Sequence, residues 1–197
     1  MATFGKTADG TNVQTFSGDR MYVCAGTPAS GGVVTSGSGR VRITAPGTTG
    51  ARIVIYSDNA GEPNAFLAQS DEVTVDWTTS TLTDFPFSGA NQITLVSSTQ
   101  YWIGFWFNDP GVPSFEMKRD NTANVVRFKA SAYPAATPTD PFGADGSSNG
   151  LLNVSITYTE GGTITIKTVD GLAQVSVKTY DGLATASTKS VNGLSNV

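Results

Sequence analysis

Apolar and polar residues alternate in short runs along most of this chain. Residues 40–44 (Arg-Val-Arg-Ile-Thr) and 72–77 (Glu-Val-Thr-Val-Asp-Trp) alternate with a period of two, which is typical of a strand with one buried face. Residues 52–57 are apolar almost throughout and predict a strand that is covered on both faces. No window shows a sustained 3.6-residue apolar period with helix caps, so the pattern predicts almost no helix.

Turn signals divide the rest of the first 160 residues into further short segments. Strands are expected at 13–16, 20–24, 91–96, 100–107, 122–130 and 154–159. The glycine-rich segment 26–39 is predicted to be a loop, with a short edge pairing at Val33 and Val34, and residues 64–70 fit either a helical turn or a strand. Roughly eight to ten short strands predict an all-β fold, a jelly-roll-like antiparallel β-sandwich over residues 1–160.

One long segment, 133–150, has three prolines and three glycines and no regular pattern. It is too long for a simple turn, so we expect either a mobile flap or a loop that packs on a neighbour. Loops of this kind often carry the function of a sandwich protein.

The last residues repeat with a period of 11. From residue 164 the units read ITIKTVDGLAQ, VSVKTYDGLAT and ASTKSVNGLSN. Asp-Gly and Asn-Gly between β-rich segments predict two-residue type I′ turns and hence a C-terminal β-meander, whereas an 11-residue solenoid bundled into a fibre is the alternative. The aligned glycines and leucines and the large residues of the apolar face are Gly171, Gly182, Gly193, Leu172, Leu183, Leu194, Ile164, Ile166, Val175 and Val177. A sheet this small is marginal alone, so residues 161–197 are predicted to be an arm for assembly.

Two resemblances follow from these motifs. The tandem Lys-Thr-x-Asp/Asn-Gly-Leu-Ala units resemble the C-terminal tails of many phage and prophage structural proteins. Residues 53–63 (IVIYSDNAGEP), 67–70 (LAQS) and 100–104 (QYWIG) resemble the jelly-roll modules of secreted and virion surface proteins, except that Asn64 follows the proline where a small residue is usual.

These resemblances imply a non-enzymatic virion component, made in the host cytoplasm, that acts in capsid decoration, in a fibre or in a tail. The implied partners are other copies of the chain, with a homotrimer favoured by analogy, and other virion proteins. The alternative role is a carbohydrate-binding or adhesion module that recognises a glycan on the host surface.

Composition agrees with a structural role. The chain has 197 residues, no histidine, one cysteine, 12 Lys plus Arg and a net charge of −4. We therefore expect no histidine-based catalytic triad or metal site, no cofactor, no nucleic-acid partner and, since no apolar run approaches the roughly 20 residues of a membrane span, no membrane partner. The first residues, 1–6, lack the apolar segment of a secretory signal, so we expect a chain made in the cytosol and used as it stands, with a trimmed leader as the alternative. Cys24 is predicted to be a small buried hydrophobe. The acidic segment 58–62 is interpreted as a turn and not as a calcium loop.

The tryptophans are the candidate ligand contacts. Trp102 and Trp106 share one face of their predicted strand, with Gly104 between them. On an exposed face such a pair would stack on sugar rings, but core packing is the favoured interpretation, and Trp77 is treated as a similar case.

Overall fold

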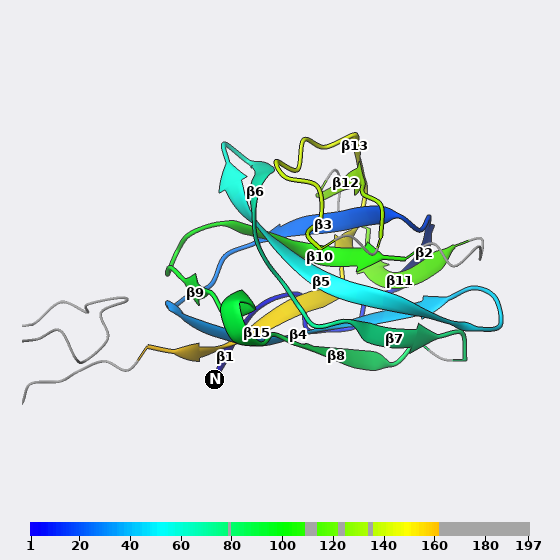
Figure 1. The fold of residues 1–197 in the computed structure, drawn as a ribbon, viewed down its shortest axis with the longest axis horizontal. Helices are drawn as coiled ribbons and strands as arrows, with labels where there is room; N and C mark the ends of the chain where they lie inside the picture. The colour runs from blue at the N-terminus through cyan, green and yellow to red at the C-terminus, as the bar shows by residue number, and fades with distance from the viewer. Residues whose placement is uncertain (79, 109–113, 122–124, 134–135, 162–197) are drawn as a thin grey trace, which may run out of the picture. The chain divides into compact units, whose positions relative to one another are not determined.

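Two antiparallel sheets account for most of the described residues and lie face to face as a sandwich (Figure 1). The computed structural model describes residues 1–78, 80–108, 114–121, 125–133 and 136–161. The strands belong to a compact unit, Met1–Glu160, and no α-helix occurs in the described part of the chain. The predicted all-β sandwich is therefore confirmed. All ten predicted arm residues lie outside the described residues, so their meander stays a prediction.

The first sheet runs in the order β1-β15-β4-β11-β14, with β2 on β11 and β8 and β9 on β4. Its strands are β1 (Ala2–Gly5), β2 (Asn12–Phe16), β4 (Gly32–Ile43), β8 (Leu82–Pro86), β9 (Thr94–Leu95), β11 (Phe115–Asp120), β14 (Leu151–Leu152) and β15 (Val154–Glu160). The second sheet runs β13-β12-β3-β10-β5-β6, with β7 on β5. Its strands are β3 (Arg20–Gly26), β5 (Thr48–Asn59), β6 (Glu62–Gln69), β7 (Val73–Asp76), β10 (Tyr101–Phe107), β12 (Val126–Ala130) and β13 (Gly146–Ser148).

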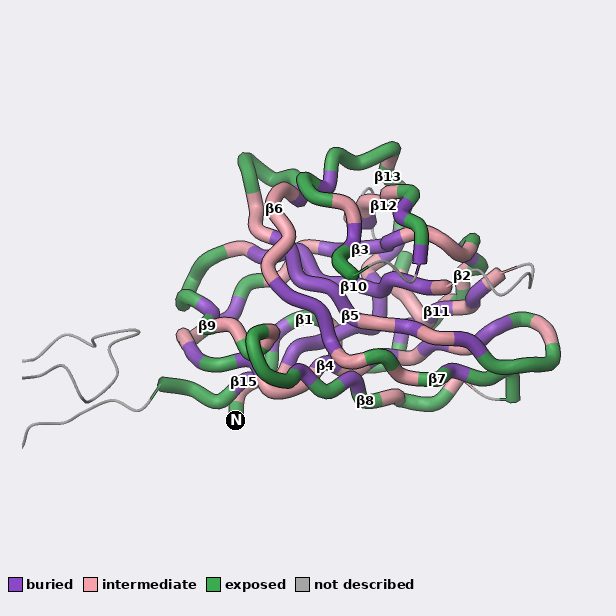
Figure 2. Tube along the Cα trace, in the orientation of Figure 1, coloured by how far each residue is buried: buried purple, intermediate pink, exposed green. Residues whose placement is uncertain are grey.

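The centre of the second sheet is buried on both faces. Every residue of β10 is buried, as are the four central residues 53–56 of β5 (Figure 2). The prediction of a doubly covered strand at 52–57 is confirmed, and its cause is plain: one face meets the first sheet, and the other meets a second apolar layer described below.

Aromatic rings fill the space between the sheets. Phe107 and Phe115 stack with ring centroids 4.0 Å apart, and Phe85 meets Phe105 edge-on at 5.8 Å. These rings come from both sheets, so they tie the two layers together. Burial of such side chains is the main stabilising term of a sandwich core.

The predicted loop at 26–39 is wrong over its second half, where β4 is a long strand of the first sheet. Gly39 lies directly under the Phe105 ring, and a Cβ at Gly37 would come within 2.7 Å of Ile53 Cδ1. These glycines are present because the opposing side chains take the space a side chain would need. In this sheet a glycine-rich run marks close packing and not a turn.

The other strand predictions were mixed. Residues 64–69 are extended in β6, which settles the helix-or-strand alternative in favour of a strand. The strand expected at 91–96 is only β9, preceded by a 3₁₀ turn at Gly89–Asn91. Strands β1, β8, β11, β13 and β14 were not predicted, and β13 lies within 133–150, where no regular element was expected. β8 ends in Pro86 and pairs only with β4, and a proline is tolerated on such an edge.

The connection between β12 and β13 packs on the outer face of the second sheet. We call its described residues, 131–133 and 136–145, the strap. The predicted alternatives for 133–150 were a mobile flap or a loop on a neighbour, but the strap packs on the chain's own sheet, with Phe142 fully buried and Tyr133 buried.

Candidate functional site

The outer face of the second sheet carries a separate apolar cluster beneath the strap. Its sheet residues are Met21, Val23, Val54, Tyr56, Trp102 and Trp106, and the strap adds Tyr133 and Phe142. The Tyr56 ring meets Phe142 edge-on at 5.0 Å, and the Trp106 ring meets Tyr133 at 4.7 Å. The strap therefore occupies the surface on which a sugar ring would have to stack.

Hydrogen bonds from buried side chains hold the strap in place. Tyr56 Oη donates to the Thr139 carbonyl at 2.7 Å, and Trp106 Nε1 donates to the Ser131 carbonyl at 2.9 Å. Gln69 Nε2 donates to the Ala136 carbonyl at 2.9 Å. Each bond satisfies a polar group that would otherwise be buried without a partner, so the strap is a built part of the fold.

Trp102 is covered by Asp58 and Arg127 and not by a hydrogen bond to the strap. Its Nε1 donates to Asp58 Oδ1 at 2.8 Å, and the Arg127 guanidinium lies over its ring, 5.5 Å from the centroid. Arg127 is fixed in turn by two hydrogen bonds to Glu62, at 2.6 and 2.8 Å. The run at 58–62 thus folds into the β5–β6 hairpin, and Asp58 and Glu62 hold the groups that cover Trp102, which agrees with the interpretation of this segment as a turn.

The three candidate tryptophans have different surroundings. Trp102 is 3% exposed and Trp106 fully buried, so the favoured interpretation of these two as core is confirmed. Trp77 is 47% exposed, so treating it as a similar core case was wrong. It follows the last residue of β7, beyond the ladder that buries Val75, and its side chain is not covered there.

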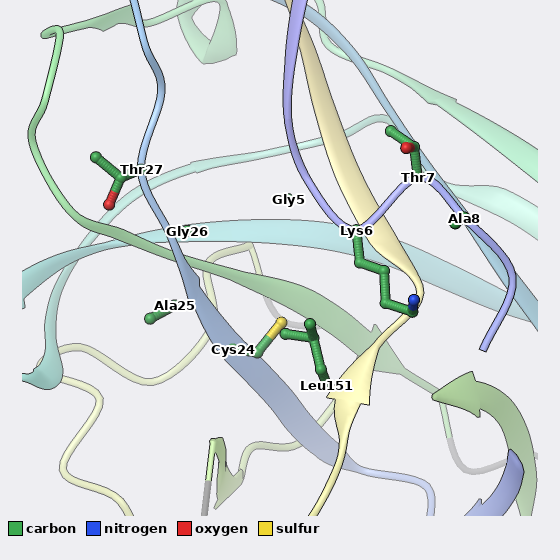
Figure 3. Close-up of a pocket in the computed structure, with 9 residues that line it drawn as sticks. All are labelled: Gly5, Lys6, Thr7, Ala8, Cys24, Ala25, Gly26, Thr27 and Leu151. Carbon is green, nitrogen blue, oxygen red and sulfur yellow. The ribbon is translucent and has the colours of Figure 1, made fainter. Parts of the chain in front are cut away.

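A first hollow lies where β1 ends beside the end of β3 (Figure 3). Backbone of Gly5 and Gly26 forms much of its wall, and the Cys24 and Leu151 side chains point toward one another in this view. Its cation, Lys6, is paired with Asp120, with Nζ and Oδ2 2.6 Å apart. Burial raises the pKa of the Cys24 thiol to about 12, so this sulfur is an inert part of the core, as predicted for Cys24.

A second hollow, of about 410 Å³, lies on the outer face of the first sheet. We call it the β7–β8 hollow, because the connection between those strands supplies two of its six lining residues. The lining residues are Val13, Arg42, Thr78, Ser80, Glu116 and Lys118. Sequence reasoning missed it, since its residues come from β2, β4, β11 and a turn, and no local motif links them.

The pKa is lowered for four carboxyl groups of the body. Burial opposes ionisation of Asp58, but hydrogen bonds from Trp102, Gly61 and Gln100 leave its pKa lowered. The hydrogen bond from Arg127 lowers the pKa of Glu62, and those from Lys6 and Lys129 lower the pKa of Asp120 and Asp145. A general acid at neutral pH needs the opposite shift, so these four groups are suited to accept hydrogen bonds, three of them within ion pairs, and not to donate a proton.

The described residues contain neither a cluster of metal ligands nor a membrane-spanning helix. Among the described residues there is no group of three or more His, Cys, Asp or Glu side chains arranged to hold a metal ion. The same part of the chain contains no helix of the length and apolarity that a bilayer crossing requires. A scan against protein-family models returns no match, and neither does a search of curated protein sequences.

Proposed function

We propose that this protein is a structural subunit of a bacteriophage particle, in which a β-sandwich body is joined to neighbouring subunits through the repeat arm at residues 161–197. The observation that carries the proposal is the threefold 11-residue repeat, whose Asx-Gly pairs and alternating aliphatic residues specify a small sheet with one apolar face. Such a face is stable only when another surface covers it. The partners are other copies of the chain and other virion proteins.

The body supports an architectural role. Its core is continuous between the sheets, the aromatic face of the second sheet is covered by the strap, and its shifted carboxyl groups serve as ion-pair partners. These features suit a subunit that must hold its shape while the arm makes the contacts. For the alternative role, carbohydrate binding, Trp102 and Trp106 are covered and are not available to stack on a sugar, whereas Trp77 is exposed.

Light scattering after size-exclusion chromatography tests the proposal directly. The full chain should elute as an oligomer, with about three times the 20.5 kDa chain mass if the favoured trimer holds. A chain ending at Gly161 should keep the far-ultraviolet spectrum of a β-sandwich and run as a monomer.

Two arm variants test whether association needs the predicted apolar face or is sensitive to any added charge in the arm. Replacing Val175 and Val177 by Asp puts two charges on the predicted apolar face and should abolish association. Replacing Ser176 and Thr185 by Asp puts the same charges on the predicted polar face and should leave the mass of the oligomer unchanged. The same number of subunits in all four proteins would refute assembly through the arm.

A further inference from the structure

The charged side chains that line the β7–β8 hollow indicate what kind of ligand it could bind. Arg42 is neutralised by Glu116, with Nε and Oε2 2.5 Å apart. The Lys118 ammonium group has no hydrogen-bond or ion-pair partner among the described residues. The hollow therefore contains one uncompensated positive charge beside an internal ion pair, which favours a ligand with a single carboxylate.

Ser80 gives a second, independent indication of a ligand. Its hydroxyl is shielded from solvent and has no hydrogen-bond partner among the described residues, although its carbonyl accepts from Arg40 Nη1 at 3.1 Å. A shielded hydroxyl without a partner costs free energy, and a ligand with hydroxyl groups in the hollow would supply one. The neighbouring Thr78 hydroxyl donates to Asp76 at 2.9 Å and so keeps acceptor capacity for a ligand hydroxyl.

Trp77 provides the apolar component. It immediately precedes Thr78 and is 47% exposed, in contrast to the two covered tryptophans. Val13, in the wall of the hollow, is also 47% exposed. Trp77 is one residue along the chain from a lining residue of the hollow, and an exposed indole suits the apolar face of a pyranose ring, whose edge carries hydroxyls.

From these three observations we infer that the β7–β8 hollow binds an acidic saccharide. Lys118 pairs with the carboxylate, the hydroxyls of Ser80 and Thr78 bond to ring hydroxyls, and Trp77 stacks on the sugar. An acidic peptide fits less well, because five of the six lining residues are polar and offer little apolar contact to peptide side chains. The inference concerns the body alone and does not rest on assembly through the arm.

Isothermal titration calorimetry of the full chain, with tryptophan fluorescence in parallel, tests the site. The probe is a trisaccharide of galacturonic acid, and the matched neutral probe is a trisaccharide of galactose. We expect the acidic probe to bind and to change the fluorescence, with an affinity that falls as salt is added. Lys118→Met keeps the aliphatic stem and should lower the affinity about tenfold, as expected for loss of one ion pair in a hydrogen-bonded site.

Two further variants test whether the fluorescence change and the affinity arise at the β7–β8 hollow. Trp77→Ala should abolish the fluorescence change, and its exposed position makes the substitution harmless to the fold. Lys129→Met removes a cation that is already paired with Asp145, 2.8 Å away, and should leave the affinity unchanged. No binding of the acidic trisaccharide, equal binding of the neutral one, or equal binding of a Glu-containing tripeptide would each overturn the inference. Full affinity in Lys118→Met would do so as well.

Discussion

Replacing Phe142 by Ala should undock the strap and expose the buried tryptophan face. Phe142 is fully buried and its ring meets Tyr56 edge-on, 5.0 Å between centroids. Truncating a buried Phe to Ala costs about 3–5 kcal/mol of unfolding free energy, which includes the loss of the aromatic pair. We expect a value of about 3 kcal/mol, at the low end, since a strap that opens locally limits the loss to its own docking free energy.

Urea unfolding and acrylamide quenching of tryptophan fluorescence measure the two effects together. In the native protein only Trp77 should be quenched, since Trp102 and Trp106 are covered. In Phe142→Ala quenching should rise in the absence of urea, because Trp106 loses the protection of the strap. Phe142→Leu is the matched control: it keeps apolar volume, should cost less than about 1.5 kcal/mol, and should keep native quenching. A loss below about 1 kcal/mol in Phe142→Ala, with unchanged quenching, would refute the view that the strap is part of the core.

Three further predictions concern other parts of the body. Ala60 has φ +54° and Gly61 φ +85° in the β5–β6 turn, and a positive φ is strained for Ala but tolerated by Asn. Ala60→Asn should therefore raise the unfolding free energy by about 0.5–1 kcal/mol in urea titrations. A decrease would contradict this explanation. Cys24, with its pKa raised to about 12 by burial, should react with a thiol reagent at pH 8 only once urea unfolds the protein. The lowered pKa of Glu62 means that its pair with Arg127 stabilises the fold above the ordinary carboxyl pKa of 4.5, and that this contribution is lost as pH falls through the lower folded-state value. Urea midpoints of the native protein should therefore fall more steeply below pH 4.5 than those of Glu62→Gln, and parallel profiles would contradict the assignment.

The fold class could be predicted from the sequence because the strongest strands have the clearest patterns. Residues 52–57 and 100–107 became β5 and β10, the buried centre of the second sheet. β4 could not be recognised, since Gly37 and Gly39 read as turn residues until the opposing Ile53 and Phe105 are placed. β11 was missed because only Phe115 and Met117 alternate with charged residues before the run becomes wholly polar.

The candidate sites were harder to predict because burial of a tryptophan depends on segments far away in the chain. Trp102 and Trp106 are equally compatible with an open or a covered face until the strap, some 25 residues further along, is placed on them. Trp77 has the same alternating context, but no segment of the described residues covers it fully, and it is 47% exposed. The β7–β8 hollow depends in the same way on residues from four separate parts of the chain.

The strap also determines which surfaces of the body can meet a partner. A β-sandwich has two outer faces, and here the outer face of the second sheet is an apolar layer closed by the chain's own residues 131–133 and 136–145. A partner would have to displace that layer, at the cost of buried aromatic area and of the hydrogen bonds from Tyr56 and Trp106, so contact there is unfavourable. On the outer face of the first sheet, Arg42, Glu116 and Lys118 line a hollow that no segment of the described residues closes. Ligand recognition by the body is therefore expected at the face that contains the β7–β8 hollow.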